Sequence, residues 1–565
     1  MYETNDKLKN SATQTELSKR LTAMRNEYFN GWQSSHQDLR TYIDQKRGVF
    51  DDNTSQRGQM INHQFLLDDH ACKANDDMAS LLHSGMTPQY RPWFDLTLDD
   101  ISLNKIPGVR AALDETKKVF NWVLNKSNIY STLISTYAEL GQFGTGCFLI
   151  VPDFEDVIRC RGFTAGEYYL GIDARGRVNS FARYFWMNVG QLIKEFGYES
   201  CSPQVQNLWK TNYPDSWHKV SHLIEPNETR IPMMDDFGNM PYRSAYWEYG
   251  AGYDKFLAVR GFKNFPVIAP RWKTVTTDQI YGYGPGWYVL GNSKQLQKTV
   301  LDRIMSQEKF HNPPMQQHGG VEGHSNLLPG GLTKFSDSLP DAGLKPAYQI
   351  DLKLESFLEA ERDLTQKIDT RFFINVLSVF LNMVDEKKTA TEINAMMSEK
   401  IAATGPILYR IQEELLDPMM ELIFSYIEEA NLLPQFPREV QGQAIKIKYV
   451  SALAQAQQAF GVEQINRVIG FVGQVVQIAP QTVDLVNWDE ALRQISELEG
   501  APAKLLYDEQ TVEGIREGKA QQEQMVKMQQ AAGMAESASK TTKNLANSPM
   551  GENSALDGLM KGVPK

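Results

Sequence analysis

The sequence holds few side chains whose types and spacing could carry out catalysis. It contains no GxxxxGKS/T phosphate-binding loop, no GxSxG nucleophile turn and no HExxH zinc helix. Two adjacent glutamate pairs, Glu413–Glu414 and Glu428–Glu429, lie in a helical stretch. Neighbouring residues on a helix do not face each other, so neither pair forms a catalytic dyad. We therefore predict no catalytic residues, no cofactor and no enzyme activity.

A glycine cluster with the sequence YGYGPG, residues 281–286, opens a helical stretch. It departs from the dinucleotide-binding pattern GxGxxG because Trp287 occupies the third glycine position. Helix N-termini bind anions readily, so an anion site is one interpretation. The interpretation we favour is a tight structural turn, formed by Gly282, Gly284, Pro285 and Gly286.

Two groups of histidines have spacings that could suit metal ligands. His218 and His222 are four residues apart, which on a helix would place both on one face. Their surroundings, YPDSWHKVSHLIEP, are typical of an extended chain instead. His311, His318 and His324 lie in or beside a loop-rich insert without an ordered frame of carboxylates. We predict no metal site at either group.

The overall charge limits the class of protein. The 565 residues include 58 Lys and Arg against 69 Asp and Glu, which gives a formal net charge of −11. A protein that grips phosphates tightly normally has a basic surface, so the charge argues against a dedicated DNA-binding protein. It does not exclude a channel through which DNA slides, and many cytosolic proteins are mildly acidic too.

The cellular compartment follows from what the sequence lacks. Its four cysteines, Cys72, Cys147, Cys160 and Cys201, are scattered without a CxxC pair, which favours a reducing compartment over a disulfide scaffold. The polar N-terminus has no apolar segment typical of a signal peptide. The longest apolar runs are shorter than the roughly 18–20 residues of a membrane helix. We expect a soluble protein, made in the cytosol, that does not enter a membrane.

The spacing of apolar residues predicts an α+β protein that is predominantly helical. Pro406 and Pro418 should kink or divide the longest helix. Helices are predicted at 13–43 with a possible break at Gly31, and at 63–83, 109–140, 187–197, 286–311, 352–380, 389–430 and much of 451–515. Strands are predicted at 93–98, 144–152, 166–187 with a turn at 173–176, 257–269 and 444–450. Residues 516–565 are predicted to be a flexible tail, in which QQEQMVKMQQAA could be helical.

Two long helices, 286–311 and 352–380, flank an insert at 313–346 that is rich in Gly, Pro, Ser and Gln. A second polar interruption, NMVDEKK at 382–388, separates two further helical stretches. Helices of this length are difficult to bury within one chain. Lateral packing in an oligomer is therefore expected.

Several patches, in one order from about Glu16 to about Leu506, resemble the head-to-tail connecting (portal) protein family of podovirus-type, short-tailed bacteriophages. The most specific is PRWKTVTTDQIYGYGPGWYVLGNSKQLQ at 270–297, similar to that family's Arg-Trp, Tyr-Gly-x-Gly-Pro and helix-start pattern. Tyr283 departs from the small or basic residue expected there. The other patches are GMTPQYRPWFDLTL at 85–98, NIYSTLISTYAELGQFGTGC at 128–147, GEYYLGIDARGRV at 166–178, QLIKEFG at 191–197, TATEINAMMSEK at 389–400 and KIKYVSALAQAQ at 446–457.

The resemblance implies a portal fold with wing, stem, clip and crown, assembled as a ring, twelve-fold in the virion, around a central channel. It divides the chain into the wing at 1–285, the first stem helix at 286–312, the clip at 313–351, the second stem helix at 352–381, the tunnel loop at 382–390, a long wing helix and strand at 391–450, the helical crown at 451–515 and the tail at 516–565.

The implied function is mechanical. The ring would nucleate head assembly at a unique capsid vertex, dock the terminase, form the channel for DNA entry and exit, and join head to tail. Implied partners are further copies of the chain in a dodecamer, double-stranded DNA, the terminase large subunit, tail adaptor or tube proteins, major capsid and scaffolding proteins, and internal core proteins. The protein would be made in the host cytoplasm and reside at the head–tail junction of the virion.

The resemblance also implies roles for three sets of residues. The tunnel loop residues Asp385, Glu386, Lys387 and Lys388 would meet DNA through weak, salt-sensitive contacts, or would form a solvent-exposed turn without DNA contact. The clip surface that meets adaptor and terminase, or alternatively a disordered loop, would comprise His311, Asn312, Pro313, Pro314, Gln316 and Gln317. The structural hinge from wing to stem would be formed by Gly282, Gly284, Pro285 and Gly286.

Three other classes of protein stay open as alternatives. One is another oligomeric virion structural protein, such as a tail tube or internal ejection protein. The second is a DNA-acting enzyme with degenerate motifs, which Mg²⁺-dependent activity on DNA would reveal. The third is a helical scaffold protein unconnected with phage, which failure to form closed rings would favour.

Overall fold

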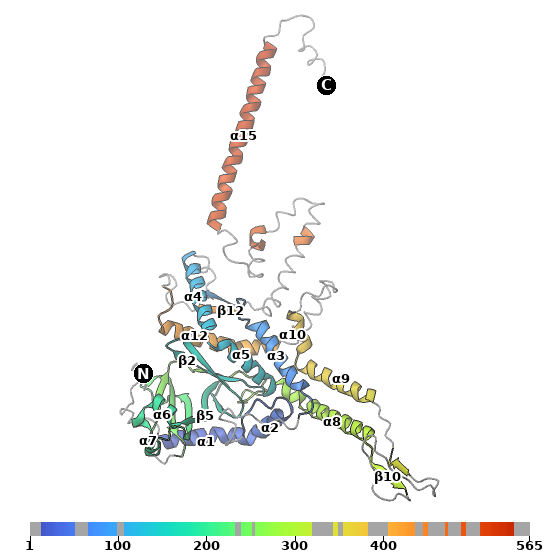
Figure 1. Cartoon of the computed structure of the whole chain (residues 1–565). Helices are drawn as coiled ribbons and strands as arrows, with labels where there is room; N and C mark the ends of the chain where they lie inside the picture. Colours follow the sequence, from blue (N-terminus) through green and yellow to red (C-terminus); the bar gives the residue numbers. More distant parts are fainter. Residues whose placement is uncertain are drawn as a thin grey trace. The chain divides into compact units, whose positions relative to one another are not determined.

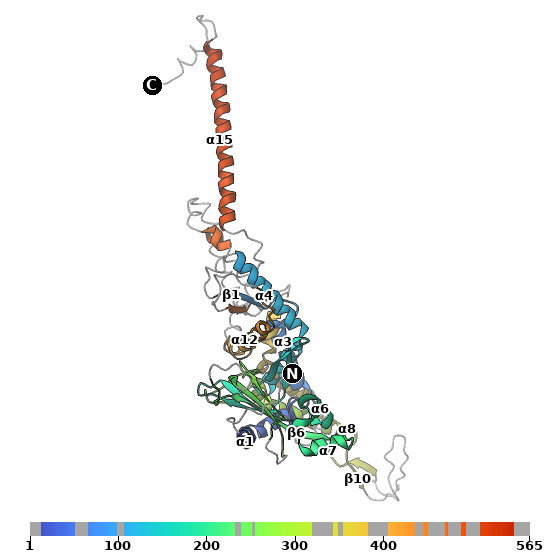
Figure 2. The same ribbon diagram turned by 90° about the vertical axis from the view of Figure 1, so that its left-hand side faces the viewer.

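The chain divides into two compact units, Met1–Gln457 and Gln458–Lys565. Every strand that is described lies in the first unit, in a five-stranded sheet, a three-stranded sheet and two further strand pairs (Figure 1, Figure 2). This mixture of helices and strands agrees with the predicted α+β class. The computed structural model describes residues 13–50, 66–98, 107–231, 239–250, 255–318, 343–348, 354–381, 405–434, 445–449, 469–472, 487–492 and 509–546.

The five-stranded sheet is antiparallel, and its strands lie side by side in chain order. The predicted turn between its first two strands is present, since Asp173 accepts main-chain hydrogen bonds from Arg175 and Arg177, both at 2.8 Å. Gly176 completes this turn at φ +77°, where a side chain would be strained. The strands are β4 (Tyr168–Ile172), β5 (Val178–Asn188), β6 (Trp217–Pro226), β7 (Tyr242–Glu248) and β8 (Ala258–Phe262).

Helices cover this sheet with two separate apolar clusters. α1 (Gln14–Gly31) starts with a capping box between Thr13 and Glu16, ends at the predicted break, and buries Leu17 and Leu21 against the sheet. The smaller cluster joins Val220 of β6 to two short helices, α6 (Val189–Phe196) and α7 (Pro203–Lys210). The short helix η3 (Tyr198–Ser200) lies between them in the chain.

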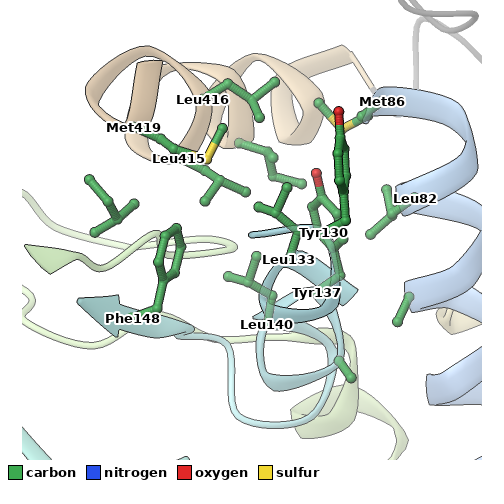
Figure 3. Close-up of a cluster of buried hydrophobic side chains, with 14 of the residues drawn as sticks. Leu82, Met86, Tyr130, Leu133, Tyr137, Leu140, Phe148, Leu415, Leu416 and Met419 are labelled. Atoms are coloured by element: carbon green, nitrogen blue, oxygen red, sulfur yellow. The ribbon is translucent and has the colours of Figure 1, made fainter. Parts of the chain in front are cut away.

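The larger core lies between helices and the three-stranded sheet. Figure 3 shows side chains of α3, α5 and β2 converging on Leu415, Leu416 and Met419. The helices of this core that precede the sheet are α3 (His70–Met86), α4 (Pro107–Lys126) and α5 (Ile129–Gln142), with α2 (Gln33–Tyr42) beside them. The sheet has the strand order β3 (Val157–Phe163), β2 (Cys147–Asp153), β9 (Val267–Ile268).

The helix that supplies Leu415 and Met419 runs from residue 405 to residue 429 with one irregular turn. Helical residues 405–411 continue into the π-helical turn η5 (Gln412–Leu416) and then into α12 (Asp417–Glu429). The Asp417 N–H bonds to the Gln412 carbonyl, five residues back. Pro418 has no N–H and its ring crowds the carbonyl of residue 414, so a widened turn here is physically expected. The irregularity predicted at Pro418 is thus a π turn. Residues 389–404 of the predicted helix lie outside the described residues.

Two strands from distant parts of the sequence form a separate pair. β1 (Phe94–Leu98) is antiparallel to β12 (Ile445–Tyr449), with Phe94 opposite Tyr449 and Leu98 opposite Ile445. Trp93 stacks on Tyr449 with ring centroids 6.2 Å apart. Both strands were predicted from alternating sequence patterns, whereas their pairing was not.

Two helices and a strand pair extend from the core. α8 (Pro285–His311) and α9 (Leu354–Arg371) lie side by side and lead to β10 (Met315–His318) and β11 (Gly343–Pro346) (Figure 1). The predicted single helix over 352–380 is divided, because Phe373 adopts φ +59° between α9 and α10 (Ile374–Leu381). This left-handed conformation is unusual for a bulky residue and ends the helix.

The second unit contains α15 (Glu509–Ala546), 38 residues long. Its described side chains are exposed except Val512, which is half-buried; Met525, Met528 and Met534 are among the exposed ones. The sequence predicted a flexible tail from residue 516, but α15 crosses that boundary. Gln, Ala, Lys, Glu and Met all favour the helix locally, so these residues can form one without burying an apolar face. No described helix is long and apolar enough to cross a membrane.

Candidate functional site

The candidate functional site is the helix pair α8–α9 with the elements at its two ends. Prolines delimit α8: Pro285 begins it, and Pro313–Pro314 follow the C-cap residue Asn312. The Nε atom of Arg303 donates a 2.6 Å hydrogen bond to Glu361 Oε1 and joins α8 to α9. This partly buried ion pair orients the two helices along their length.

The same pair is anchored to the helical core at its inner end. Gln297 of α8 accepts hydrogen bonds from the main-chain N–H groups of Leu67 (2.8 Å) and Asp68 (3.1 Å). In α9, Asp369 Oδ1 lies 2.8 Å from His70 Nε2. The inner halves of both helices therefore belong to the helical core.

Farther out, both helices present apolar side chains to solvent. The six apolar side chains named at the end of this paragraph are 37–52% exposed, whereas Leu296 and Val300 of α8 are buried. Positions 301, 304 and 305 have the spacing that places side chains on one helix face. The pair thus has a second apolar side besides the one in the core. Its exposed members are Leu301, Ile304, Met305 and Phe310 of α8, and Leu354 and Leu358 of α9.

The residues predicted to form the clip surface lie at the outer end of the pair. Gln316 and Gln317 are in β10, opposite Lys345 and Leu344 of β11. The Ala347 N–H donates a 2.7 Å bond to the Pro314 carbonyl and extends the strand pairing by one residue. His311, Asn312, Pro314 and Gln316 are exposed, and Pro313 is half-buried. Residues 319–342, between the two strands, lie outside the described part of the chain.

At the inner end, the predicted glycine turn packs main chain against main chain. A Cβ atom on Gly284 would lie 2.3 Å from the Leu140 carbonyl oxygen, and one on Gly286 would lie 2.5 Å from that of Gln142. A Cβ on Gly282 would lie 2.5 Å from the carbonyl oxygen of Gly144, which itself has φ +86°. These separations leave no room for side chains. The turn between 281 and 286 is accordingly occupied by protein backbone, which argues against the anion-site interpretation.

Aromatic rings surround a buried histidine beside this turn. His36 Nδ1 lies 2.7 Å from the Tyr28 hydroxyl, and the rings of Trp32, Phe143 and Trp287 are within 6 Å of its own. Burial lowers the pKa of His36 to about 3. The imidazole is therefore neutral at ordinary pH, which suits an apolar setting.

A buried arginine joins the segment before α8 to the helix at 405–429. Arg271 makes a bidentate ion pair with Glu414, with Nε–Oε2 at 3.1 Å and Nη2–Oε1 at 2.9 Å. Its remaining donors reach the carbonyls of Gln279 (2.8 Å) and Gly176 (3.0 Å). Sequence reasoning missed this role for Glu414. The signal that was available was the Arg-Trp pair at 271–272 in the most specific patch.

Of the histidines considered as ligands, His222 has other partners. His218 and His222 lie on strand β6, in keeping with the predicted extended chain. His222 is buried, accepts a hydrogen bond from Arg183 Nε (3.2 Å) and lies 2.9 Å from Ser244 Oγ. Burial and the nearby Arg183 hold its pKa well below the ordinary value. Among the described residues, no three His, Cys, Asp or Glu side chains are grouped to hold a metal ion.

The residues predicted to form the tunnel loop, Asp385, Glu386, Lys387 and Lys388, lie outside the described residues. So does His324 of the second histidine group. The structure describes the elements on either side of the loop: α10 ends at Leu381, and the helix containing Glu414 begins at residue 405.

Comparison with known proteins gives matches over most of the chain. A family model described as "Bacteriophage head to tail connecting protein" matches residues 14–506. The chain is 32% identical over 552 residues to "Portal protein" of Salmonella phage epsilon15, covering 97% of this chain and 98% of that protein. It is 34% identical over 502 residues to "Probable portal protein" of Bordetella phage BPP-1, covering 89% and 90%.

Among solved structures, a chain from the neck of an empty gene transfer agent particle aligns with a TM-score of 0.36 at 10% identity. The alignment covers 74% of this chain and 92% of that chain.

Proposed function

The chain belongs to the bacteriophage head-to-tail connecting protein family, and from this premise we propose how it acts as a portal protein. It is a virion component of a short-tailed phage, located at the head–tail junction at one capsid vertex. There it joins head to tail. The single observation that carries this conclusion is identity above 30% to portal proteins over nearly the whole chain.

The chain acts as a closed, dodecameric ring, with α8 and α9 as the stem around a central channel. The exposed apolar side chains at 301, 304, 305, 354 and 358 support this part of the proposal. Apolar surface of this kind is stabilised when a neighbour covers it, and a ring of identical chains supplies the same neighbour to every copy. The wing comprises residues 1–285, which include the five-stranded sheet, and residues 391–450, and the helical crown is residues 451–515.

The strand pair β10–β11 and the residues that lead into it, His311 to Gln317, form the clip, which docks the terminase large subunit and later the tail adaptor. Support comes from their place at the outer end of α8 and α9 and from the exposure of Phe310, Met315 and Tyr348 nearby. Capsid, scaffolding and internal core proteins contact other parts of the ring.

Double-stranded DNA passes through the channel, and Asp385–Lys388 contact it there. Two lysines beside two carboxylates would attract phosphates only weakly and in a salt-dependent way, which suits DNA that moves in both directions. Replacement of Lys387 and Lys388 by alanine should lower the DNA packaged per head while ring formation is unchanged. Replacement by arginine, which keeps the charge, is the matched control.

Electron microscopy of the purified full-length protein, viewed along the symmetry axis, tests the ring. Closed rings with a central hole and about twelve-fold symmetry are expected. Monomers or open fibres would overturn the ring proposal. Protein copy number per virion separates a portal from a tail tube or ejection protein, because a portal is present as one ring per particle.

A further inference from the structure

Two consecutive residues, Arg271 and Trp272, are fixed by their main chain to the segment at 144–146, against which the glycine turn at the start of α8 packs. The Trp272 N–H donates a 2.9 Å bond to the Gly144 carbonyl, and the Gly146 N–H donates a 3.1 Å bond to Pro270. Thr145 and Arg271 form an isolated β-bridge between these two bonds. The dipeptide therefore moves with the segment at 144–146, on which the glycines of the turn are packed.

The Arg271 side chain holds the helix at 405–429 at its irregular turn. Glu414 accepts three hydrogen bonds from this one residue: from Nε, from Nη2 and from the main-chain N–H at 2.9 Å. Glu414 lies inside the π turn, and its carbonyl is the one that Pro418 leaves without an α-helical donor. The ion pair thus contacts the helix at its π turn, where Pro418 removes one α-helical hydrogen bond.

The Trp272 side chain, which is buried, contacts the joint between α9 and α10. Its ring lies 6.1 Å from that of Phe373, the residue at φ +59°. A bulky residue keeps such a conformation only where its surroundings enforce it. The neighbouring Phe372 is fully buried, and the Phe373 carbonyl accepts hydrogen bonds from Val376 (3.0 Å) and Leu377 (2.9 Å) at the start of α10.

We propose that Arg271 and Trp272 are positioning residues that couple three elements: the start of α8, the joint at Phe373 and the helix at 405–429. Arg271 and Trp272 are adjacent in the chain and fixed to one backbone segment. A displacement of α10 therefore shifts the helix at 405–429, and the reverse. The role of this coupling in DNA passage rests on the proposed function. α10 and the helix at 405–429 are the described elements on either side of the proposed DNA-contacting residues. The coupling itself is a property of described residues alone.

Hydrogen exchange of the full-length protein tests the coupling directly. Arg271→Lys keeps the charge but loses the bidentate geometry. We expect about tenfold faster exchange at Asp417 and also at Phe373, Val376 and Leu377, which the Arg271 side chain does not contact. Trp272→Leu changes the side chain that contacts Phe373, and it should also accelerate exchange at Asp417 by a similar factor. The proposal would be overturned if Arg271→Lys accelerated exchange only at Asp417 and Trp272→Leu only at Phe373, Val376 and Leu377.

Arg243→Lys is the matched control, because Arg243 forms a buried ion pair with Glu225 in the five-stranded sheet. It should accelerate exchange in the sheet and leave Asp417 and Phe373 unchanged. In phage heads assembled with intact rings, Arg271→Lys should reduce packaged DNA about tenfold and Arg243→Lys less than about twofold. Normal packaging with altered exchange would refute the role in DNA passage. Failure of the unsubstituted chain to form rings would refute the portal function, while the exchange result would still stand.

Discussion

At the scale of single residues, the start of α8 depends on the absence of side chains. Gly284 has an ordinary negative φ of −95°, so its backbone would accept alanine, yet carbonyl oxygens of Leu140 and Gly141 occupy the place of a Cβ. These are main-chain atoms and cannot rotate away. The sequence pattern YGYGPG therefore marks close packing of two chain segments, and the main-chain atoms that fill this place favour a tight structural turn over an anion site.

We expect Gly284→Ala to destabilise the protein by about 1–3 kcal/mol, the usual cost of overpacking a filled site. Gly291→Ala is the matched control in the same helix, because a Cβ there has nothing within 4 Å. Helix propensity should make the control neutral or slightly stabilising. Denaturant unfolding of both variants measures the difference, and equal stability of the two would contradict the packing argument.

Buried His36 makes a prediction about pH. Its pKa is about 3 in the folded protein and about 6.5 when unfolded, so the unfolded chain binds the proton between these values. The stability that neutral His36 contributes is fully present above pH 6.5 and falls as the pH is lowered, by about 1.4 kcal/mol per pH unit for one proton. His36→Gln should therefore flatten the dependence of unfolding free energy on pH between about 6.5 and 4. His311→Gln, at an exposed position, controls for loss of a histidine; coincident slopes for His36→Gln and the unsubstituted protein would refute the prediction.

At the scale of elements, local sequence signals predicted where α8 begins and ends. They did not predict which of its apolar residues are buried within the same chain. The helix predicted at 286–311 carries Leu296, Val300, Ile304 and Met305 at helical spacing, and the structure buries the first two and exposes the last two. The reason is that α8 leaves the core after about four turns. A stripe in the sequence does not say whether its partner belongs to the same chain.

Ile304→Asp combined with Met305→Lys should abolish ring assembly and leave the folded unit intact. Both side chains are more than 40% exposed, so the unassembled chain loses little burial, whereas an interface would acquire unpaired charges. Lys298→Gln, at another exposed position of α8, serves as the control and should assemble normally. Sedimentation velocity and circular dichroism together report assembly and fold. Rings that persist in the double variant would remove these residues from the interface.

At the scale of the whole molecule, the net charge of −11 bears on how the protein meets DNA. In the proposed ring this net charge would repel duplex DNA at long range, so attraction would have to come from local contacts. We expect free duplex DNA to bind purified rings no more tightly than about 10⁻⁶ M at about 0.15 M salt, with affinity that falls as salt rises. Titrations at two salt concentrations measure this. Nanomolar, salt-resistant binding would favour a dedicated DNA-binding protein.

The sequence by itself determined the family, the α+β class and the bounds of several helices and strands. Proline and glycine act on the backbone locally, so the limits of α8 at Pro285 and Asn312, the end of α1 at Gly31 and the turn at Gly176 could be predicted from neighbouring residues. The clip role of His311 to Gln317 stays a prediction. The predicted tunnel loop stays a prediction.

Only the tertiary structure decided which distant segments meet. The pairing of β1 with β12, the ion pair of Arg271 with Glu414 and the bend at Phe373 each join residues far apart in the chain or depend on such contacts. Local propensity would continue the helix through Phe373, and it predicted no partner for Glu414. Such features are stabilised by long-range packing and desolvation, which depend on the whole folded arrangement and leave no periodic signal in the sequence.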